Sequence, residues 1–217
     1  MSEHMALENL TVLDLTRVLA GPFCTMMLAD MGANVIKIEV PKGGDDTRGY
    51  PPFRAKNLNG ERESVYFANI NRNKKGITLN LKAPEGKEIF KELVKKADIV
   101  VENYRPGVMD KLGLGYDVLK EINPRIIYAA VSGFGCYGPY HLRPGYDILA
   151  QAMGGMMSIT GSKGGEPTRA GSALGDILGG LHVTIGILAA VNARTITGKG
   201  QRVDVSLMDT MIAATEN

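Results

Sequence analysis

One carboxylate in a glycine-rich segment is the first candidate for chemistry in this chain. Asp176 lies within Gly171-Ser-Ala-Leu-Gly-Asp-Ile-Leu-Gly-Gly180, at the start of a long apolar run. A position near a helix N-terminus favours the ionised carboxylate, and neighbouring glycines leave room for a bulky ligand. Such an aspartate can attack an activated carbonyl and carry a covalent acyl intermediate. The same pattern fits an N-cap, with Gly179 and Gly180 allowing close helix packing, and caps are far commoner than nucleophiles.

Two other groups of side chains could bind an anionic ligand. Arg72, Lys74 and Lys75 precede a predicted strand that ends at Lys82. These cations could clamp a phosphate group, or they could form a solvated edge of the fold. The segment Asn103-Tyr-Arg-Pro-Gly107 follows a buried strand. Ligands of α/β sheets bind at such a place, although a plain turn before a helix fits the same residues.

A third segment, Gly133-Phe-Gly-Cys-Tyr-Gly138, matches the glycine pattern of dinucleotide-binding loops directly after a predicted strand. It runs into Pro139 and Pro144 instead of opening a helix, and the acidic residue expected about 20 residues later is missing. We therefore expect a loop shaped for a different ligand. His182 is not at helical spacing from Asp176, and its apolar neighbours predict a core histidine rather than a base.

The elements that must position these residues alternate between strand and helix. Hydrophobic periodicity and turn residues predict strands over 11–15, 34–39, 76–81, 98–102, 125–132 and 202–206, and helices over 20–32, 84–97, 107–112, 117–122, 146–154 and 176–195. A long loop is expected over 41–60. The alternation predicts an α/β fold with a mostly parallel sheet and helices on both faces. Ligands of such a sheet bind at the carboxyl ends of its strands.

Composition limits the class of protein. The chain has 217 residues, enough for one sizeable core, and its net charge of +2 gives no argument for binding nucleic acid or an anionic membrane. Cys24 and Cys136 form no paired motif, which predicts no metal site and fits a reducing cytoplasm. No signal peptide is visible. The apolar run 177–191 falls short of the roughly 18 residues that cross a membrane, so we expect a buried core helix.

Taken together and in order, these segments resemble the class III coenzyme A transferases, the family that includes formyl-CoA transferase, carnitine CoA-transferases and α-methylacyl-CoA racemases. The matching stretches are Leu13–Pro22, Gly32–Glu39, Gly44–Arg48, Asn71–Lys75, Val101–Gly107, Gly133–Gly135 with Gly138 and Pro139, Arg143–Asp147, Gly175–Asp176 and Thr197–Gln201. The resemblance covers nearly the whole chain. It implies that residues 10–200 form a Rossmann-like, CoA-binding large domain.

The resemblance also implies the chemistry of Asp176. In such a transferase the aspartate attacks the thioester carbonyl of an acyl-CoA, which gives an aspartyl-acyl anhydride and CoA thiolate. The thiolate returns to form an aspartyl-CoA thioester, and an acceptor carboxylic acid then completes the transfer. CoA and acyl-CoA are substrates, and no cofactor is bound permanently. Because both intermediates hydrolyse readily, the protein must exclude water.

Ligand contacts follow from the same resemblance. To the cations Arg72, Lys74 and Lys75 it adds CoA contacts from the first loop, the segment after the basic cluster and the loop after the buried strand: Val18, Ala20, Leu79, Lys82, Asn103, Tyr104, Arg105 and Lys111. Tyr50, Tyr146 and Asp147 would form the pocket for the small acid. Lys111 and Val40 stand where formyl-CoA transferase has CoA-contacting arginines, so the contact at Val40 is not expected here.

The pair Tyr146-Asp147 separates two activities within the family. Racemases have a His-Asp pair at this place, and the histidine exchanges the α-proton. The ordinary pKa of tyrosine, near 10, suits a base poorly, so Tyr146 favours CoA transfer. An acyl-CoA racemase stays the first alternative, and a non-catalytic fragment that binds CoA or a partner stays the second. A dinucleotide oxidoreductase comes last.

Family members are longer than this chain, and two of them interlock as a homodimer. We therefore expect residues 1–9 to be a flexible N-terminus or tag remnant, and residues 201–217 to begin the connection to a small domain that is missing here. In formyl-CoA transferase the absent part includes a glycine-rich loop that covers the active aspartate. A C-terminal half or second subunit would complete the enzyme, and this chain alone would be inactive or slow.

Overall fold

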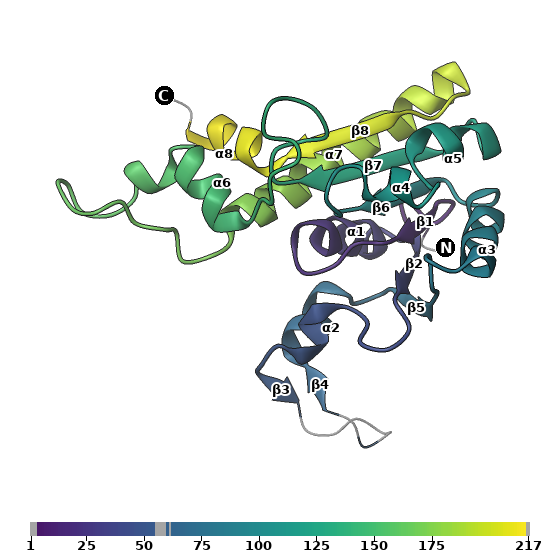
Figure 1. The fold of residues 1–217 in the computed structure, drawn as a ribbon, viewed down its shortest axis with the longest axis horizontal. Helices are drawn as coiled ribbons and strands as arrows, with labels where there is room; N and C mark the ends of the chain where they lie inside the picture. Colours follow the sequence, from purple (N-terminus) through teal and green to yellow (C-terminus); the bar gives the residue numbers. More distant parts are fainter. Residues whose placement is uncertain (1–3, 55–59, 61, 216–217) are drawn as a thin grey trace.

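The computed structural model describes residues 4–54, 60 and 62–215 (Figure 1). Its main sheet contains β1 (Thr11–Asp14), β2 (Asn34–Glu39), β5 (Lys75–Thr78), β6 (Ile99–Glu102), β7 (Ile127–Ser132) and β8 (Arg202–Ser206). All neighbouring strands are parallel, in the order β5-β2-β1-β6-β7-β8. In the register of the central strands, Val12 lies between Val35 and Ile99. The prediction of a mostly parallel α/β sheet is confirmed.

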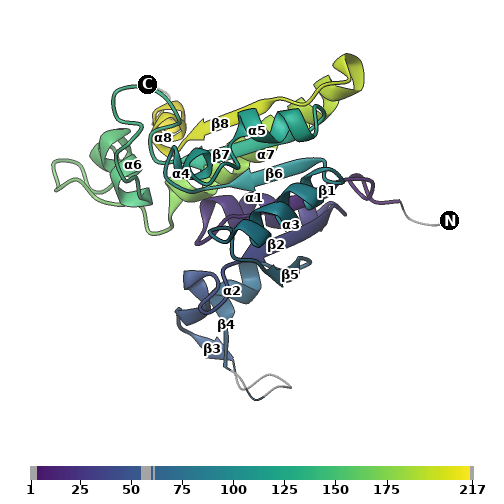
Figure 2. The same cartoon turned by 45° about the vertical axis from the view of Figure 1, so that its right-hand side comes forward.

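Helices cover both faces of this sheet (Figures 1 and 2). The helices of the described chain are α1 (Ala20–Asp30), α2 (Val65–Ile70), α3 (Pro84–Val94), α4 (Val108–Lys111), α5 (Tyr116–Ile122), α6 (Asp147–Met153), α7 (Leu174–Thr197) and α8 (Leu207–Thr215). Alternating side chains of the strands supply the two cores. Val12 and Val101 pack with α1 and α7 in one apolar cluster. Leu13 and Val100 pack with α3, α4 and α5 in the other.

The segment predicted as one long loop contains structure of its own. It holds the 3-10 turn η1 (Asp46–Gly49) and the short strand β3 (Phe53–Arg54), which pairs antiparallel with β4 (Glu63–Ser64). Helix α2 follows, and the Ser64 hydroxyl caps it by accepting a hydrogen bond of 3.2 Å from the Phe67 N–H. This unit projects beyond the β5–β2 edge of the sheet (Figures 1 and 2). Residues 55–59 of the predicted loop lie outside the described residues.

Helix α7 is longer than the apolar run suggested. Its 24 residues are long and apolar enough to cross a membrane by length and composition, which corrects the length argument made from the sequence. A core helix meets the same criterion, and Val183, Ile187 and Ala190 are buried in the cluster with α1. Other positions are open, because Ile185 and Ile196 are exposed. The expectation of a buried core helix therefore holds for one face of α7.

The two ends of the described chain both join this core. Leu7 is buried, and its backbone N–H donates a hydrogen bond of 3.0 Å to the Met31 carbonyl, so the segment expected to be flexible packs from this residue onward. Helix α8 follows β8 directly and packs against α6 and α7. Through these contacts α6, α7 and α8 form one corner of the molecule, next to the carboxyl end of β7.

Candidate active site

A cavity of about 510 Å³ opens at the carboxyl ends of β1, β6 and β7. Eight of the predicted site residues line it: Val18, Ala20, Asn103, Tyr104, Arg105, Tyr146, Asp147 and Asp176. They come from the loops after β1 and β6 and from the starts of α6 and α7. This is the edge at which ligands of parallel sheets bind.

The Asp176 carboxylate is a partly buried group at this cavity. Asp176 is the third residue of α7, and the N-cap position is occupied by Ala173. The N-cap interpretation of Asp176 is therefore wrong. Among the described residues, no group donates a hydrogen bond to its carboxylate or forms an ion pair with it. A carboxylate at a cavity with neither kind of partner is available to a ligand.

The electrostatic environment of Asp176 differs from the one expected. Burial and, after it, the charge of Asp147 raise the pKa of Asp176 to about 6, while Arg169 acts in the opposite direction. The helix terminus was expected to favour the ionised form, and here burial outweighs that effect. With this pKa the carboxyl group of Asp176 is still mostly ionised at neutral pH, and it binds a proton more tightly than an ordinary aspartate does.

The glycines around Asp176 serve packing. Gly175 is buried, and a Cβ there would lie 3.2 Å from Asp147 Oδ1. A Cβ on Gly179 would collide with Leu207, and one on Gly180 would lie 2.8 Å from the Ala20 carbonyl oxygen. The packing role considered for Gly179 and Gly180 is thus confirmed. These two glycines do not provide the expected room for a ligand.

Helix α6 holds the start of α7 through Asp147. Asp147 Oδ1 accepts a hydrogen bond of 2.8 Å from the Gly175 N–H, directly before Asp176. Asp147 Oδ2 accepts from Gln151 Nε2 at 2.8 Å and from Arg169 Nη2 at 2.9 Å. A residue predicted for the substrate pocket therefore binds the backbone of Gly175, the residue before Asp176. Tyr146 is largely exposed at the same rim.

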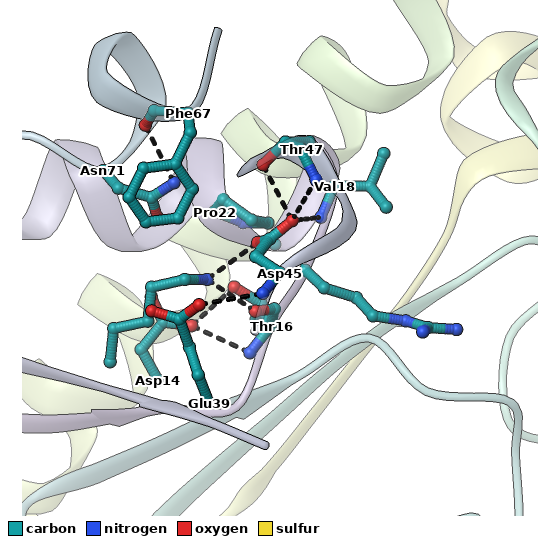
Figure 3. Close-up of polar contacts among 12 residues, drawn as sticks. Asp14, Thr16, Val18, Pro22, Glu39, Asp45, Thr47, Phe67 and Asn71 are labelled. Carbon is teal, nitrogen blue, oxygen red and sulfur yellow. Dashed lines mark hydrogen bonds and ion pairs between the residues drawn. The ribbon is translucent and has the colours of Figure 1, made fainter. Parts of the chain in front are cut away.

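The loop after β1 is fixed from below by buried charges (Figure 3). Val18 has φ of 68°, a left-handed conformation that is uncommon for a β-branched residue. Its N–H donates to Asp45 Oδ1 at 3.3 Å, and Lys37 Nζ donates to the Thr16 carbonyl at 2.8 Å. Lys37 and Asp45 also form a buried ion pair of 3.0 Å. Such strain persists only where surrounding contacts over-determine it.

The loop after β6 is joined to the loop after β1. Asn103 Oδ1 accepts from the Arg17 N–H at 2.9 Å, and Asn103 Nδ2 donates to the Arg17 carbonyl at 2.7 Å. Glu102, at the end of β6, accepts from the Tyr104 N–H at 2.7 Å. Asn103 therefore has a structural role in the site, because it fixes two cavity loops relative to each other.

The cations of the basic cluster, one of the two groups considered for phosphate binding, bind other residues of the chain. Lys74 Nζ is buried with 1% of its side chain exposed, and it forms an ion pair of 3.0 Å with Asp14. Arg72 pairs with Asp30, and Lys75 Nζ donates to Asn34 Oδ1 at 2.7 Å. These cations already have protein partners, and Lys74 supports the chain beneath the first loop. The remaining predicted contacts Leu79, Lys82, Lys111 and Tyr50 do not line the cavity.

Tyr50 nevertheless has a connection to the site. Its ring packs edge-to-face on Tyr66 of α2, with 5.8 Å between the ring centroids. Burial and, after it, the charge of Asp176 raise the pKa of Tyr66 to about 12. The phenol of Tyr66 thus lies within electrostatic range of Asp176. The sequence did not indicate Tyr66, because no element was predicted over residues 65–70, which form α2.

Further cavity residues were missed. Arg17 and Arg143 line the cavity together with Arg105, so three arginines surround it. Arg17 also pairs with Asp46 at 3.3 Å, and the Arg143 guanidinium lies over the Tyr140 ring. Both lie within stretches that carry the family resemblance, and that position could have identified them. Ser132 Oγ, also at the cavity, is buried without a hydrogen-bond partner among the described residues. His182 is exposed, and its Nδ1 lies 2.8 Å from the Leu178 carbonyl oxygen, so the core-histidine prediction is wrong.

Comparison with known proteins shows the family of this chain. The family model described as CoA-transferase family III matches residues 7–217. An acyl-CoA transferase of Fusarium pseudograminearum is 51% identical over 100% of this chain and 48% of its own length. A succinyl-CoA:mesaconate CoA-transferase of Haloarcula marismortui is 48% identical over 97% of this chain and 54% of its own length. A crystal structure of a CaiB/BaiF family protein from Brucella suis has a TM-score of 0.94 at 45% identity, over 99% of this chain and 56% of that one. The chain spans about half the length of the curated relatives it matches.

Proposed function

The chain belongs to CoA-transferase family III, and from this we propose that it carries the nucleophile of an enzyme that moves CoA from an acyl-CoA to a carboxylic acid. The observation that supports the proposal is the state of Asp176. Its carboxylate lies at the cavity, partly buried and without a hydrogen-bond partner among the described residues. Neither capping nor ion pairing accounts for this carboxylate, whereas a nucleophile has to keep a free oxygen for the substrate.

The first half of the proposed reaction forms two bonds in turn. An Asp176 Oδ atom attacks the thioester carbonyl carbon, the C–S bond breaks, and CoA leaves as the thiolate. The product on the enzyme is a mixed anhydride. The thiolate then attacks Asp176 Cγ, and the donor acid leaves as a carboxylate that carries one oxygen from Asp176. Asp176 is now bound to CoA as a thioester.

The second half reverses these steps with another acid. The acceptor carboxylate attacks Asp176 Cγ and releases the thiolate, which gives a second anhydride. The thiolate attacks the acceptor carbonyl, and the new acyl-CoA leaves while Asp176 regains a carboxylate. One carboxylate replaces another at similar energy, so the sequence of steps balances without an external energy source.

The environment of Asp176 suits this exchange. Burial and Asp147 raise the pKa of Asp176 to about 6. The carboxylate is therefore more basic than that of an ordinary aspartate, which makes it a better nucleophile toward an acyl group. Partial burial also strips water from the attacking oxygen. The guanidinium groups of Arg17, Arg105 and Arg143 around the cavity would attract the anionic CoA.

We assign CoA to the loops after β1 and β6. The backbone at Val18 and Ala20 and the side chains of Tyr104 and Arg105 line one side of the cavity, opposite Asp176 on α7. Arg72, Lys74 and Lys75 are left out of this assignment because none of them lines the cavity.

We propose small dicarboxylic acids as the first class of acids to test. The relative from Haloarcula marismortui is named for succinyl-CoA and mesaconate. Tyr146, which stands largely exposed at the rim, would contribute to the pocket for the acid with Asp147 behind it. The cations lining the cavity could pair with a second carboxylate.

We also propose that a second polypeptide segment or subunit completes the site. The chain covers about half of its relatives, and large apolar side chains are exposed on α6, before it and after it. Tyr137, Leu142, Tyr146, Ile148 and Ile159 are each at least half exposed. A homodimer is the first arrangement to test. If the site needs this second segment or subunit, the chain alone transfers CoA slowly. A chain that only binds CoA and transfers none would be the extreme of this behaviour.

Covalent trapping tests the proposal. The protein is incubated with succinyl-CoA and other acyl-CoAs, quenched with hydroxylamine, and digested for mass spectrometry. We expect a hydroxamate on the peptide that contains Asp176, absent in Asp176→Ala and retained in Asp209→Asn, which alters an exposed acid of α8. Exchange of the α-proton into deuterated solvent without a hydroxamate would instead favour the racemase, and neither signal with any acyl-CoA would contradict the assignment of Asp176 as nucleophile.

A further inference from the structure

The segment that leads into the nucleophile is held by two residues of α6. Residues 169–175 connect an exposed stretch to the start of α7, and Gly171 and Ser172 are exposed. Within the described chain, every side-chain hydrogen bond that joins this segment to another element involves Asp147 or Gln151. The position of Asp176 at the cavity therefore depends on these contacts.

Gln151 forms hydrogen bonds with the backbone of the segment on both sides of Gly171. Its side chain is fully buried, with 0% exposed. Gln151 Oε1 accepts from the Ala170 N–H at 3.0 Å, and Nε2 donates to the Ser172 carbonyl at 3.3 Å. The same Nε2 donates to Asp147 Oδ2 at 2.8 Å. A buried amide with both of its polar atoms used is costly to replace, since any lost partner leaves an unsatisfied group.

Asp147 joins this contact to the helix that carries Asp176. Its Oδ1 accepts from the Gly175 N–H, and Gly175 is packed so closely that a Cβ would lie 3.2 Å from that oxygen. Its Oδ2 accepts from Arg169 Nε at 3.2 Å and Nη2 at 2.9 Å. Arg169 is 41% exposed on its side chain, so it closes the cluster on the solvent side.

We propose that Arg169 and Gln151 are positioning residues that act through Asp147 to place the Asp176 carboxylate and set its charge environment. The role of Asp176 as nucleophile rests on the proposed function, whereas its placement by these residues does not. Gln151 fixes the path of the chain, and Arg169 balances the negative charge of Asp147 beside Asp176. The two residues therefore differ in what their removal changes.

The charges of Asp147 and Arg169 act on the pKa of Asp176 in opposite directions. Asp147 raises the pKa of Asp176 and Arg169 lowers it. The other charged or titratable groups facing the cavity are Arg17, Tyr104, Arg105, Arg143 and Tyr146, and Tyr66 interacts with Asp176 from α2. Within the described chain, none of these residues forms a hydrogen bond with Asp147 or Gln151. Changes at Arg169 and Asp147 should thus shift the titration of Asp176 in opposite directions.

Carbon-13 NMR of the Asp176 carboxyl carbon measures this titration without any substrate. The resonance is assigned in protein with labelled aspartate by its loss in Asp176→Asn. We expect Arg169→Gln to raise the midpoint by roughly half a unit or more and Asp147→Asn to lower it by a similar amount. Arg169→Lys should stay near the wild type. Arg125→Gln removes the same charge at the far end of β7 and should leave the midpoint unchanged.

Gln151→Met tests the geometric part. We expect the hydroxamate-forming rate constant to fall about tenfold or more, with a smaller change in the half-saturating acyl-CoA concentration and in the Asp176 midpoint. A circular dichroism melt identifies any variant that fails to fold, and Arg169→Lys keeps the charge test valid in that case. Shifts of the same sign for Arg169→Gln and Asp147→Asn, or no shift in either, would overturn the inference. Absence of a hydroxamate in the wild type would count against the proposed function alone, since the NMR titration decides the positioning inference separately.

Discussion

At the scale of single residues, Asp176 has two properties that oppose each other. Partial burial makes its carboxylate basic and poorly hydrated, which favours attack on a thioester. The same burial raises its pKa to about 6, which reduces the fraction that is ionised in mildly acidic solution. Asp147 adds to this effect and also anchors the neighbouring peptide, so one residue connects the electrostatics of the nucleophile with its placement.

The first consequence concerns the pH dependence of acylation. Because the carboxylate attacks, we expect the rate of hydroxamate formation at Asp176 to rise with pH through about 6 and to level off near neutrality. Below this midpoint, each pH unit removes about 90% of the reactive form. Single-turnover rates at saturating acyl-CoA, corrected for uncatalysed thioester reaction at each pH, measure the profile. A rate that is constant between about pH 5 and 8 would show that the ionisation of Asp176 does not control the step.

The second consequence concerns stability. The folded-state pKa of Asp176 lies above its ordinary value of 3.8, so the folded protein binds more protons than the unfolded chain between these values. The free energy of unfolding should therefore fall as pH rises from about 4 to 6 and stay reduced above. We expect Asp176→Asn to stabilise the fold at pH 7 by about 1 to 2 kcal/mol, after discounting for partial exposure, and not at pH 3. Urea unfolding at both pH values measures the difference, with Asp209→Asn as the exposed control. Equal stability of Asp176→Asn and wild type at pH 7 would contradict the raised pKa.

At the scale of elements, the loop after β1 is shaped by residues far from it in sequence. Lys37 from β2 donates to the Thr16 carbonyl, Asp45 before η1 accepts from the Val18 N–H, and Lys74 before β5 pairs with Asp14 at the end of β1. Figure 3 shows Asp14, Thr16, Val18 and Asp45 close together. Burial alone would raise the pKa of Asp14, but Lys74, Lys37 and the hydroxyls of neighbouring threonines hold it below its usual range. These paired charges give the left-handed turn at Val18 a fixed support.

The buried pair of Asp14 and Lys74 gives a prediction at this scale. Lys74→Met should lower the free energy of unfolding by about 3 kcal/mol, because it leaves the Asp14 carboxylate buried without its 3.0 Å partner. The double variant Asp14→Asn with Lys74→Met should recover part of this loss, since neither charge is then left alone. Lys75→Met, at the exposed neighbouring lysine, should change stability by less than about 0.5 kcal/mol. Urea unfolding measures all four proteins, and equal costs for Lys74→Met and Lys75→Met would refute the structural role of Lys74.

At the scale of the whole molecule, apolar side chains remain exposed on α6 and the segment after it. Ile148 and Ile159 are among them. Ile148 lies on α6, and Ile159 directly follows the 3-10 turn η2 (Met156–Ser158), which packs against α6 and α8. Exposed apolar groups that gather in one region are typical of an interaction surface. The chain covers only about half of its relatives, which fits a surface that another segment or subunit covers.

A surface substitution tests this interpretation. We expect wild-type protein to associate with itself in a concentration-dependent way, and Ile148→Lys with Ile159→Lys to weaken that association without loss of stability. Sedimentation velocity over a concentration series gives the measurement. Ile89→Lys, which alters an exposed isoleucine on α3 across the sheet, serves as the control. Association that is unchanged by the double substitution would place the interface elsewhere.

Much of the architecture could be predicted from local signals. Short buried strands and helices with clear stops gave the alternation that the sheet confirms, and the glycines around Asp176 marked the start of α7. Side-chain partners could not be predicted in the same way. Lys74 read as a solvated cation, and only the fold brings it to Asp14; Gln151 and Arg169 carry no local signal, since their partners lie across a helix and a loop. Helix α2 was missed because it is short and follows a loop rich in turn residues.

The central claim is that Asp176 exchanges its own oxygen with substrate carboxylates, and isotope transfer tests it most directly. The protein is incubated with an unlabelled acyl-CoA and an acceptor acid that carries oxygen-18 in its carboxylate, and the peptide containing Asp176 is then weighed. We expect Asp176 to gain oxygen-18 during turnover. The bridging oxygen of the acceptor stays on Cγ when the thiolate attacks the acceptor carbonyl of the second anhydride. Formation of the new acyl-CoA with no oxygen-18 in Asp176 would contradict the account, since the carboxylate would then never have been an acyl carrier.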